Sequence, residues 1–97
     1  HYMKSINLRL AKGFGQVSNE VMRDPELSLK DKGLYAYLCT FAGSQTNELI
    51  VSVYRMADEC GTSPSTIKRS IETLQSKGII DRVYMGKGKT RKTIILK

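Results

Sequence analysis

The sequence predicts a winged helix-turn-helix, a mainly α fold of the α+β class with three core helices, a small β-sheet and a C-terminal β-hairpin wing. Three observations predict it. Residues 57–71 read as two helices meeting at a glycine-containing turn, apolar residues recur at helical spacing on both sides of it, and two strand-like runs follow around a glycine- and lysine-rich loop. In the turn, Gly61 suits the C′ position of the first helix and Pro64 the N1 position of the second. With 97 residues the chain has room for one domain, so residues 1–97 are expected to form a single unit.

The N-terminal quarter gives weaker signals. Residues 1–2 precede a methionine and are interpreted as the remnant of an expression tag, which would make the single histidine foreign to the protein. Residues 3–12 alternate apolar and polar side chains, which favours a short strand or an extended arm. Residues 17–23 are expected to form one or two helical turns that end before Pro25, because a residue that precedes proline avoids the helical region.

The first core helix is predicted over residues 28–42. Ser28 and Asp31 form a capping-box pattern with Asp in place of Glu, and the helix would end before Gly43. The apolar residues at helical spacing are Leu34, Tyr37, Leu38 and Phe41.

A brief strand at residues 49–51 and a second core helix over residues 52–60 are expected next. Ser52 suits the N-cap of this helix. Its predicted inner face consists of Val53, Met56, Ala57 and Cys60.

The third helix, over residues 64–77, is the predicted recognition helix, and residues 79–97 the predicted wing hairpin. Ser63 suits the helix N-cap and Gly78 its C-terminal end. Ile67, Ile71 and Leu74 recur at i, i+4 and i+7 and would face the core. The wing strands are expected at residues 79–85 and 90–96, around the loop 86–89.

The charge of the chain is concentrated in its second half. The formal net charge is +7; residues 1–48 hold six Lys or Arg against five Asp or Glu, and residues 49–97 hold ten against four. A basic half that coincides with a helix-turn-helix favours nucleic acid as the partner, although a membrane surface or an acidic protein would also attract it.

The candidate DNA-binding residues fall into two groups. Lys68 or Arg69 would donate to guanine O6 and N7 in the major groove, and hydroxyls near the helix N-terminus would reach a base edge or a phosphate. Basic side chains at the hairpin tip would contact the backbone and supply salt-sensitive affinity. The helix group is Ser63, Ser65, Thr66, Lys68, Arg69 and Glu72, and the tip group is Lys87, Lys89, Arg91 and Lys92.

A simpler interpretation stays open for each group. A basic helix face and a lysine-rich hairpin are often only solvated surface, and Lys68 and Arg69 could merely balance Glu72 along the helix. Tyr35, Tyr37 and Tyr54 could form an aromatic dimer patch, but helical spacing favours core packing for Tyr37.

Of the functional classes considered, an enzyme has the least support in the sequence. No native histidine is expected, and no carboxylates are paired at a suggestive spacing, so we expect neither an enzyme nor a cofactor. Cys39 and Cys60 lack the spacing of a zinc site and are expected to be buried thiols in a reducing cytoplasm. No apolar run has the length of a membrane span, which favours a cytoplasmic protein without a membrane partner.

The sequence also resembles a known family, the N-terminal winged-helix domain of RepA-type replication initiators. These initiators occur in plasmids, phages and conjugative elements of Gram-positive bacteria. The resemblance covers about residues 13 to 84 and is carried by residues 13–24 (GFGQVSNEVMRD), 27–28 (LS), 32–38 (KGLYAYL) and 41–43 (FAG). It implies binding to repeated origin DNA, often as a dimer, and contact with further replication proteins. In that family a further domain follows the wing, the point at which this sequence ends.

Two alternatives remain at this point. One is a transcriptional regulator, which would use the same chemistry on a different site. The other is a protein-interaction winged helix of replisome assembly, whose basic face would meet an acidic partner. A homodimer would read two half-sites about one helical turn apart, with the arm at residues 3–12 as its predicted contact.

Overall fold

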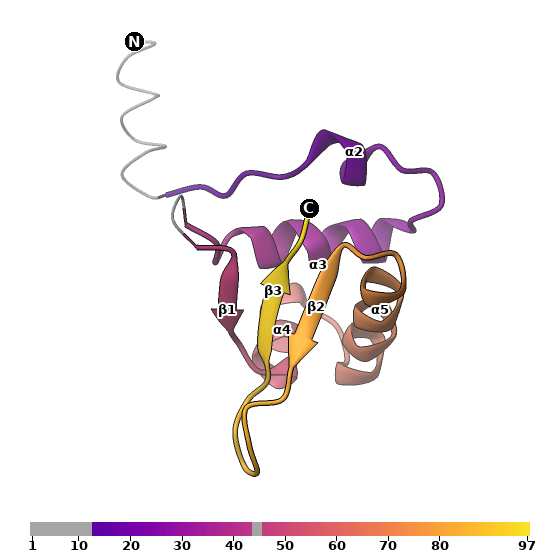
Figure 1. Ribbon diagram of the computed structural model, residues 1–97. Helices are drawn as coiled ribbons and strands as arrows, with labels where there is room; N and C mark the ends of the chain where they lie inside the picture. Colours follow the sequence, from indigo (N-terminus) through magenta and orange to yellow (C-terminus); the bar gives the residue numbers. More distant parts are fainter. Residues whose placement is uncertain (1–12, 44–45) are drawn as a thin grey trace, which may run out of the picture.

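Helices and a three-stranded antiparallel sheet enclose a common hydrophobic core in the computed structural model, which describes residues 13–43 and 46–97 (Figure 1). The predicted winged helix-turn-helix is confirmed: three core helices are followed by a β-hairpin. The elements are α2 (Asn19–Met22), α3 (Leu29–Cys39), β1 (Glu48–Ile50), α4 (Val53–Cys60), α5 (Pro64–Ser76), β2 (Ile80–Val83) and β3 (Lys92–Ile95).

The short helix α2 precedes the core and lies at the end of the molecule opposite the wing tip (Figure 1). Ser18 caps it by accepting a hydrogen bond from the amide of Val21. The predicted strand or arm at residues 3–12 lies outside the described residues. Within the described part of the chain, none of the helices is both long and apolar enough to cross a lipid bilayer.

Helix α3 begins with a capping box. The hydroxyl of Ser28 accepts from the amide of Asp31 at 3.1 Å, and the carboxylate of Asp31 accepts from the amide of Ser28 at 3.2 Å. The prediction of a helix over residues 28–42 overran the C-terminal end, because the amides of Thr40 and Phe41 donate to carbonyls three residues back. These tighter bonds close the last turn and end the α-helix at Cys39.

The sheet has the strand order β1-β3-β2, so the C-terminal strand pairs with both others. Both wing strands are shorter than the predicted ranges 79–85 and 90–96, because residues 84–91 form the loop that projects from the sheet (Figure 1). Strand alternation turns the side chains of Leu49, Ile80, Thr93 and Ile95 inward, where all four are buried.

Each core helix contributes a side chain with no exposed surface, namely Leu38 of α3, Met56 of α4 and Leu74 of α5. Burying an apolar side chain of this size stabilises the fold by about 1.5–3 kcal/mol. Tyr35 is also buried, and its hydroxyl accepts from the amide of Ser18 and donates to the carbonyl of Lys97, both at 2.9 Å. The core therefore also holds the segment before α2 and the C-terminal end.

Two side-chain expectations have different outcomes. Tyr37 packs against the core as a half-buried residue, and Tyr54 is exposed. The prediction that both thiols are buried holds for Cys39 and is wrong for Cys60. Cys60 is the last residue of α4, directly before the left-handed Gly61, where fewer neighbouring side chains cover it than at the middle of the helix.

Candidate nucleic-acid interface

The turn between α4 and α5 has the geometry of a Schellman motif. Gly61 has φ 68° and ψ 38°, in the left-handed region where residues with a Cβ are strained. Its amide donates to Asp58 O at 3.2 Å, and the amide of Thr62 donates to Ala57 O at 2.9 Å. Two carbonyls at the end of α4 are thereby satisfied, and the direction of α5 relative to α4 is fixed.

Ser63, a predicted DNA-binding residue, is the N-cap of α5. Its hydroxyl oxygen accepts from the amide of Thr66 at 3.2 Å and lies 3.1 Å from Ser65 Oγ and 3.0 Å from Thr66 Oγ1. The primary role of Ser63 is therefore to start the recognition helix. Ser65 is exposed, so its hydroxyl remains accessible to a ligand from outside the helix.

Helix α5 buries one face and exposes the predicted contact residues on the other. The buried residues are Ile67, Ser70, Ile71 and Leu74. Ser65, Lys68, Arg69 and Glu72 are exposed, and Thr66 is half-buried. Successive helical residues are about 100° apart, so Lys68 and Arg69 point in different directions. Lys68 faces the wing, whereas Arg69 lies beside Ser28 and Lys30 at the start of α3.

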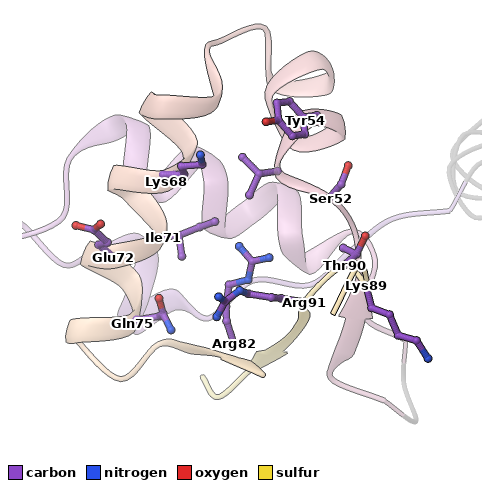
Figure 2. Close-up of a pocket in the computed structure, with 12 residues that line it drawn as sticks. Ser52, Tyr54, Lys68, Ile71, Glu72, Gln75, Arg82, Lys89, Thr90 and Arg91 are labelled. Atoms are coloured by element: carbon purple, nitrogen blue, oxygen red, sulfur yellow. The ribbon is translucent and has the colours of Figure 1, made fainter. Parts of the chain in front are cut away.

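A groove of about 640 Å³ separates α5 from the wing, with the start of α4 as its third side (Figure 2). We call it the wing groove. It is lined by Ser52, Val53, Tyr54, Lys68, Ile71, Glu72, Gln75, Arg82, Gly88, Lys89, Thr90 and Arg91. Residues from the recognition helix and the wing, predicted separately from the sequence, thus border one cavity.

The wing loop carries three of the four predicted tip residues. Lys87 and Lys89 are exposed, and Arg91 lies over the ring of Tyr84, with its guanidinium carbon 5.6 Å from the ring centroid. The prediction that Lys92 belongs to the tip is wrong. Lys92 begins β3, and its ammonium group lies 3.2 Å from the carboxylate of Glu48 on β1, so that the ion pair links two strands of the sheet.

Ion pairs divide the basic residues into two groups. Four cations have a carboxylate within 4 Å; the pairs are Arg55 with Glu59, Lys77 with Asp24 and Glu26, Lys92 with Glu48, and Lys97 with Glu20. Among the described residues, Lys68, Arg69, Lys87 and Lys89 have no carboxylate within this distance. The alternative in which Lys68 and Arg69 pair with Glu72 is therefore not observed.

Arg82 on β2 borders the wing groove and was missed in the sequence analysis. Its Nε is buried without a hydrogen-bond partner among the described residues. Burial lowers the pKa of its guanidinium, and the nearby charge of Arg91 lowers this pKa further. The period-two pattern could have identified it, because Arg82 lies two residues after the buried Ile80 and so points to the same side of the strand.

Comparison with known proteins gives one positive result. Residues 26–80, more than half of the chain, match the model of a family described as a helix-turn-helix domain. The match extends from just before α3 to the first residue of β2 and includes the turn and the whole of α5. No curated protein matches the chain. A helix-turn-helix domain indicates double-stranded DNA as the partner, because its second helix has the dimensions to enter the major groove. The chain belongs to this family of helix-turn-helix domains.

Proposed function

We propose that this domain binds a specific double-stranded DNA sequence and serves as the DNA-binding domain of a replication initiator of a mobile element. The observation that supports DNA binding most strongly is the convergence of α5 and the wing on one groove, where Lys68 and Lys89 lack carboxylate partners among the described residues. The initiator role rests on the resemblance to RepA-type initiators that residues 13–24, 27–28, 32–38 and 41–43 carry. Binding, without catalysis, is the proposed activity.

The exposed face of α5 would read the bases. Arg69 lies on that face without an ion pair to a described residue, so its guanidinium is available to donate to O6 and N7 of a guanine. Glu72 is one helical turn from Lys68 and could accept from the N4 amino group of a cytosine. Ser65 and Thr66, at the N-terminus of the helix, would contact a phosphate or a base edge.

The wing would add affinity that depends on salt and little on sequence. Lys87 and Lys89 are exposed on a loop beyond the sheet, where their ammonium groups can follow the DNA backbone. A homodimer on repeated half-sites about one helical turn apart is part of the proposal, because two such domains would together select a repeat.

The test is a fluorescence-anisotropy titration with a random duplex and with a repeat selected from a random library, each at low and moderate salt. The proposal expects tight binding that weakens steeply with salt and favours the selected repeat by at least about tenfold. Weak binding without sequence preference or salt dependence would contradict it and would favour the protein-interaction alternative. Occupation of tandem repeats would support the initiator role, whereas selection of one isolated palindrome would favour a transcriptional regulator.

A further inference from the structure

Arg82 occupies an unusual position for an arginine, on the inner side of the sheet. It is the direct strand partner of Thr93 on β3, and it lies two residues after Ile80; both of these neighbours are buried. Arg82 itself is half-buried. Its side chain therefore begins at a core-facing position and ends in the wing groove (Figure 2).

The inner end of this arginine lacks a polar partner. Its Nε and the Oγ1 of Thr93 are both buried without a hydrogen bond to a described residue. A buried charged group normally has a carboxylate or several acceptors around it, because loss of hydration is costly. The buried Nε itself is out of reach, but the terminal nitrogens of the guanidinium lie in the groove, where they can donate to a ligand.

A second arginine increases the local positive charge. Arg82 and Arg91 both line the wing groove, and Figure 2 shows their guanidinium groups side by side, pointing into it. Their repulsion is strong enough to lower the pKa of Arg82 beyond the effect of burial. Glu72 is the one carboxylate among the residues that line the described groove, and it forms no ion pair with either arginine. Among the described residues, no carboxylate occupies the pair, so an anion from outside the domain can bind there.

A phosphodiester fits these donors best. The planar guanidinium offers parallel N–H donors that match the oxygens of a phosphate, and desolvation strengthens the bonds that it forms. The pair lines the same groove as the exposed α5 residues Lys68, Glu72 and Gln75. A duplex whose bases face α5 would therefore present a backbone phosphate close to the two arginines.

We propose that Arg82 and Arg91 together hold one backbone phosphate of the bound DNA at the base of the wing. This inference rests on the proposed function, since it needs a duplex seated on α5. It distinguishes Arg82 from the wing-tip lysines, whose charges remain in solvent. Because the contact is made to a phosphate, it contributes equally to preferred and random sequences.

The first test replaces Arg82 by methionine, which keeps the length of the aliphatic stem and removes the charge. The matched control is Arg23→Met, the same substitution at an exposed position next to α2, at the opposite end of the molecule from the wing (Figure 1). Thermal unfolding of both variants without DNA checks the fold. Arg82→Met is expected to unfold at the same temperature as the wild type or higher, because a desolvated and repelled charge is gone.

DNA binding is then titrated by anisotropy against salt. Losing one phosphate contact reduces the slope of log affinity against log salt by about 0.9. When salt is raised from about 50 to 200 mM, the wild type should therefore lose about 3.5-fold more affinity than Arg82→Met. The loss at low salt should be equal for the selected and the random duplex, and Arg82→Lys should recover part of the affinity.

The outcomes separate the inference from the function on which it rests. If the wild type shows no salt-sensitive DNA binding, the proposed function fails. If the wild type binds and Arg82→Met matches Arg23→Met, the phosphate contact alone is refuted. A loss confined to the selected duplex would also refute it, since Arg82 would then read a base.

Free phosphate is distinguished by a separate experiment. The wild type is melted in inorganic phosphate and in chloride at equal ionic strength. A backbone contact that depends on a seated duplex predicts little difference between the two salts. Strong stabilisation by inorganic phosphate, lost in Arg82→Met and without a matching effect on DNA binding, would overturn the proposal in favour of a free-anion site.

Discussion

The wing loop offers the clearest test of how the domain obtains its affinity. In the double variant Lys87→Ala/Lys89→Ala, two exposed ammonium groups are removed that have no carboxylate within 4 Å among the described residues. Gly86 and Gly88, which have the positive φ angles of this loop, are unchanged, so its backbone should be preserved. The double variant should therefore fold as the wild type does.

The expected magnitude follows from counting phosphate contacts. Each lost contact reduces the slope of log affinity against log salt by about 0.9, so two contacts account for about 1.8. Over the range from about 50 to 200 mM salt, the wild type should lose about 12-fold more affinity than the double variant. The measurement is an anisotropy titration at four or more salt concentrations, with both the selected and the random duplex.

A control with the same loss of charge makes the result specific. Lys32 and Lys97 lie near acidic residues, Lys32 close enough to Asp24 to affect its pKa and Lys97 at 3.4 Å from Glu20. Lys32→Ala/Lys97→Ala removes two positive charges without touching the wing. If both double variants show the same slope, net charge alone governs binding and the assigned role of the wing is refuted. A wing variant that loses affinity only for the selected duplex would also contradict the reasoning.

Three further predictions concern the recognition helix, the turn and acid stability. Arg69→Ala should weaken binding to the selected duplex by about 1–3 kcal/mol and leave the random duplex nearly unaffected; equal losses in a competition titration would exclude base reading. Gly61→Ala places a Cβ at φ 68° and should lower the free energy of unfolding in urea by about 1 kcal/mol, whereas an unchanged value would contradict the strain. The hydrogen bond from the Tyr37 hydroxyl lowers the pKa of Glu59, with Arg55 adding to the effect, so the folded state favours the carboxylate. The stability that this carboxylate contributes is present above the ordinary Glu pKa of 4.5 and is lost as the pH falls through the lowered pKa. Tyr37→Phe should therefore lose less stability than the wild type between pH 7 and pH 3. Equal pH profiles of the two proteins in urea unfolding would refute the coupling.

Helix starts and the central turn could be predicted because their signals are local. Ser28, Ser52 and Ser63 each accept a hydrogen bond from the amide three residues later, as the cap patterns predicted. Gly61 takes the left-handed conformation expected at C′. Each of these features depends on neighbours within a few residues, so the sequence contains all the partners.

Two of the errors, on Lys92 and on Arg82, concern residues whose role depends on distant partners. The ion pair of Lys92 with Glu48 forms only when β3 inserts between β1 and β2, a strand order that the hairpin pattern does not specify. Arg82 was treated as one more charge of a basic chain, although the alternation of β2 already placed it on the core side. Its relevance depends on Arg91 across the hairpin and on α5 across the groove, and tertiary packing alone brings these together.

The distribution of ion pairs also bears on which class of partner the basic surface suits. Lys77 and Lys97 are held by carboxylates of the α2 region, whereas Lys68, Arg82 and Lys89 in the wing groove have no such partner among the described residues. The core of a protein interface is depleted of lysine but enriched in arginine, so Lys68 and Lys89 are the residues that argue against a protein partner. A groove lined by cations without carboxylate partners instead suits a ligand with regularly spaced negative charges and exposed hydration, which is the character of a DNA backbone. The wing groove therefore favours DNA over an acidic protein on grounds of charge arrangement, independently of the match to the helix-turn-helix family.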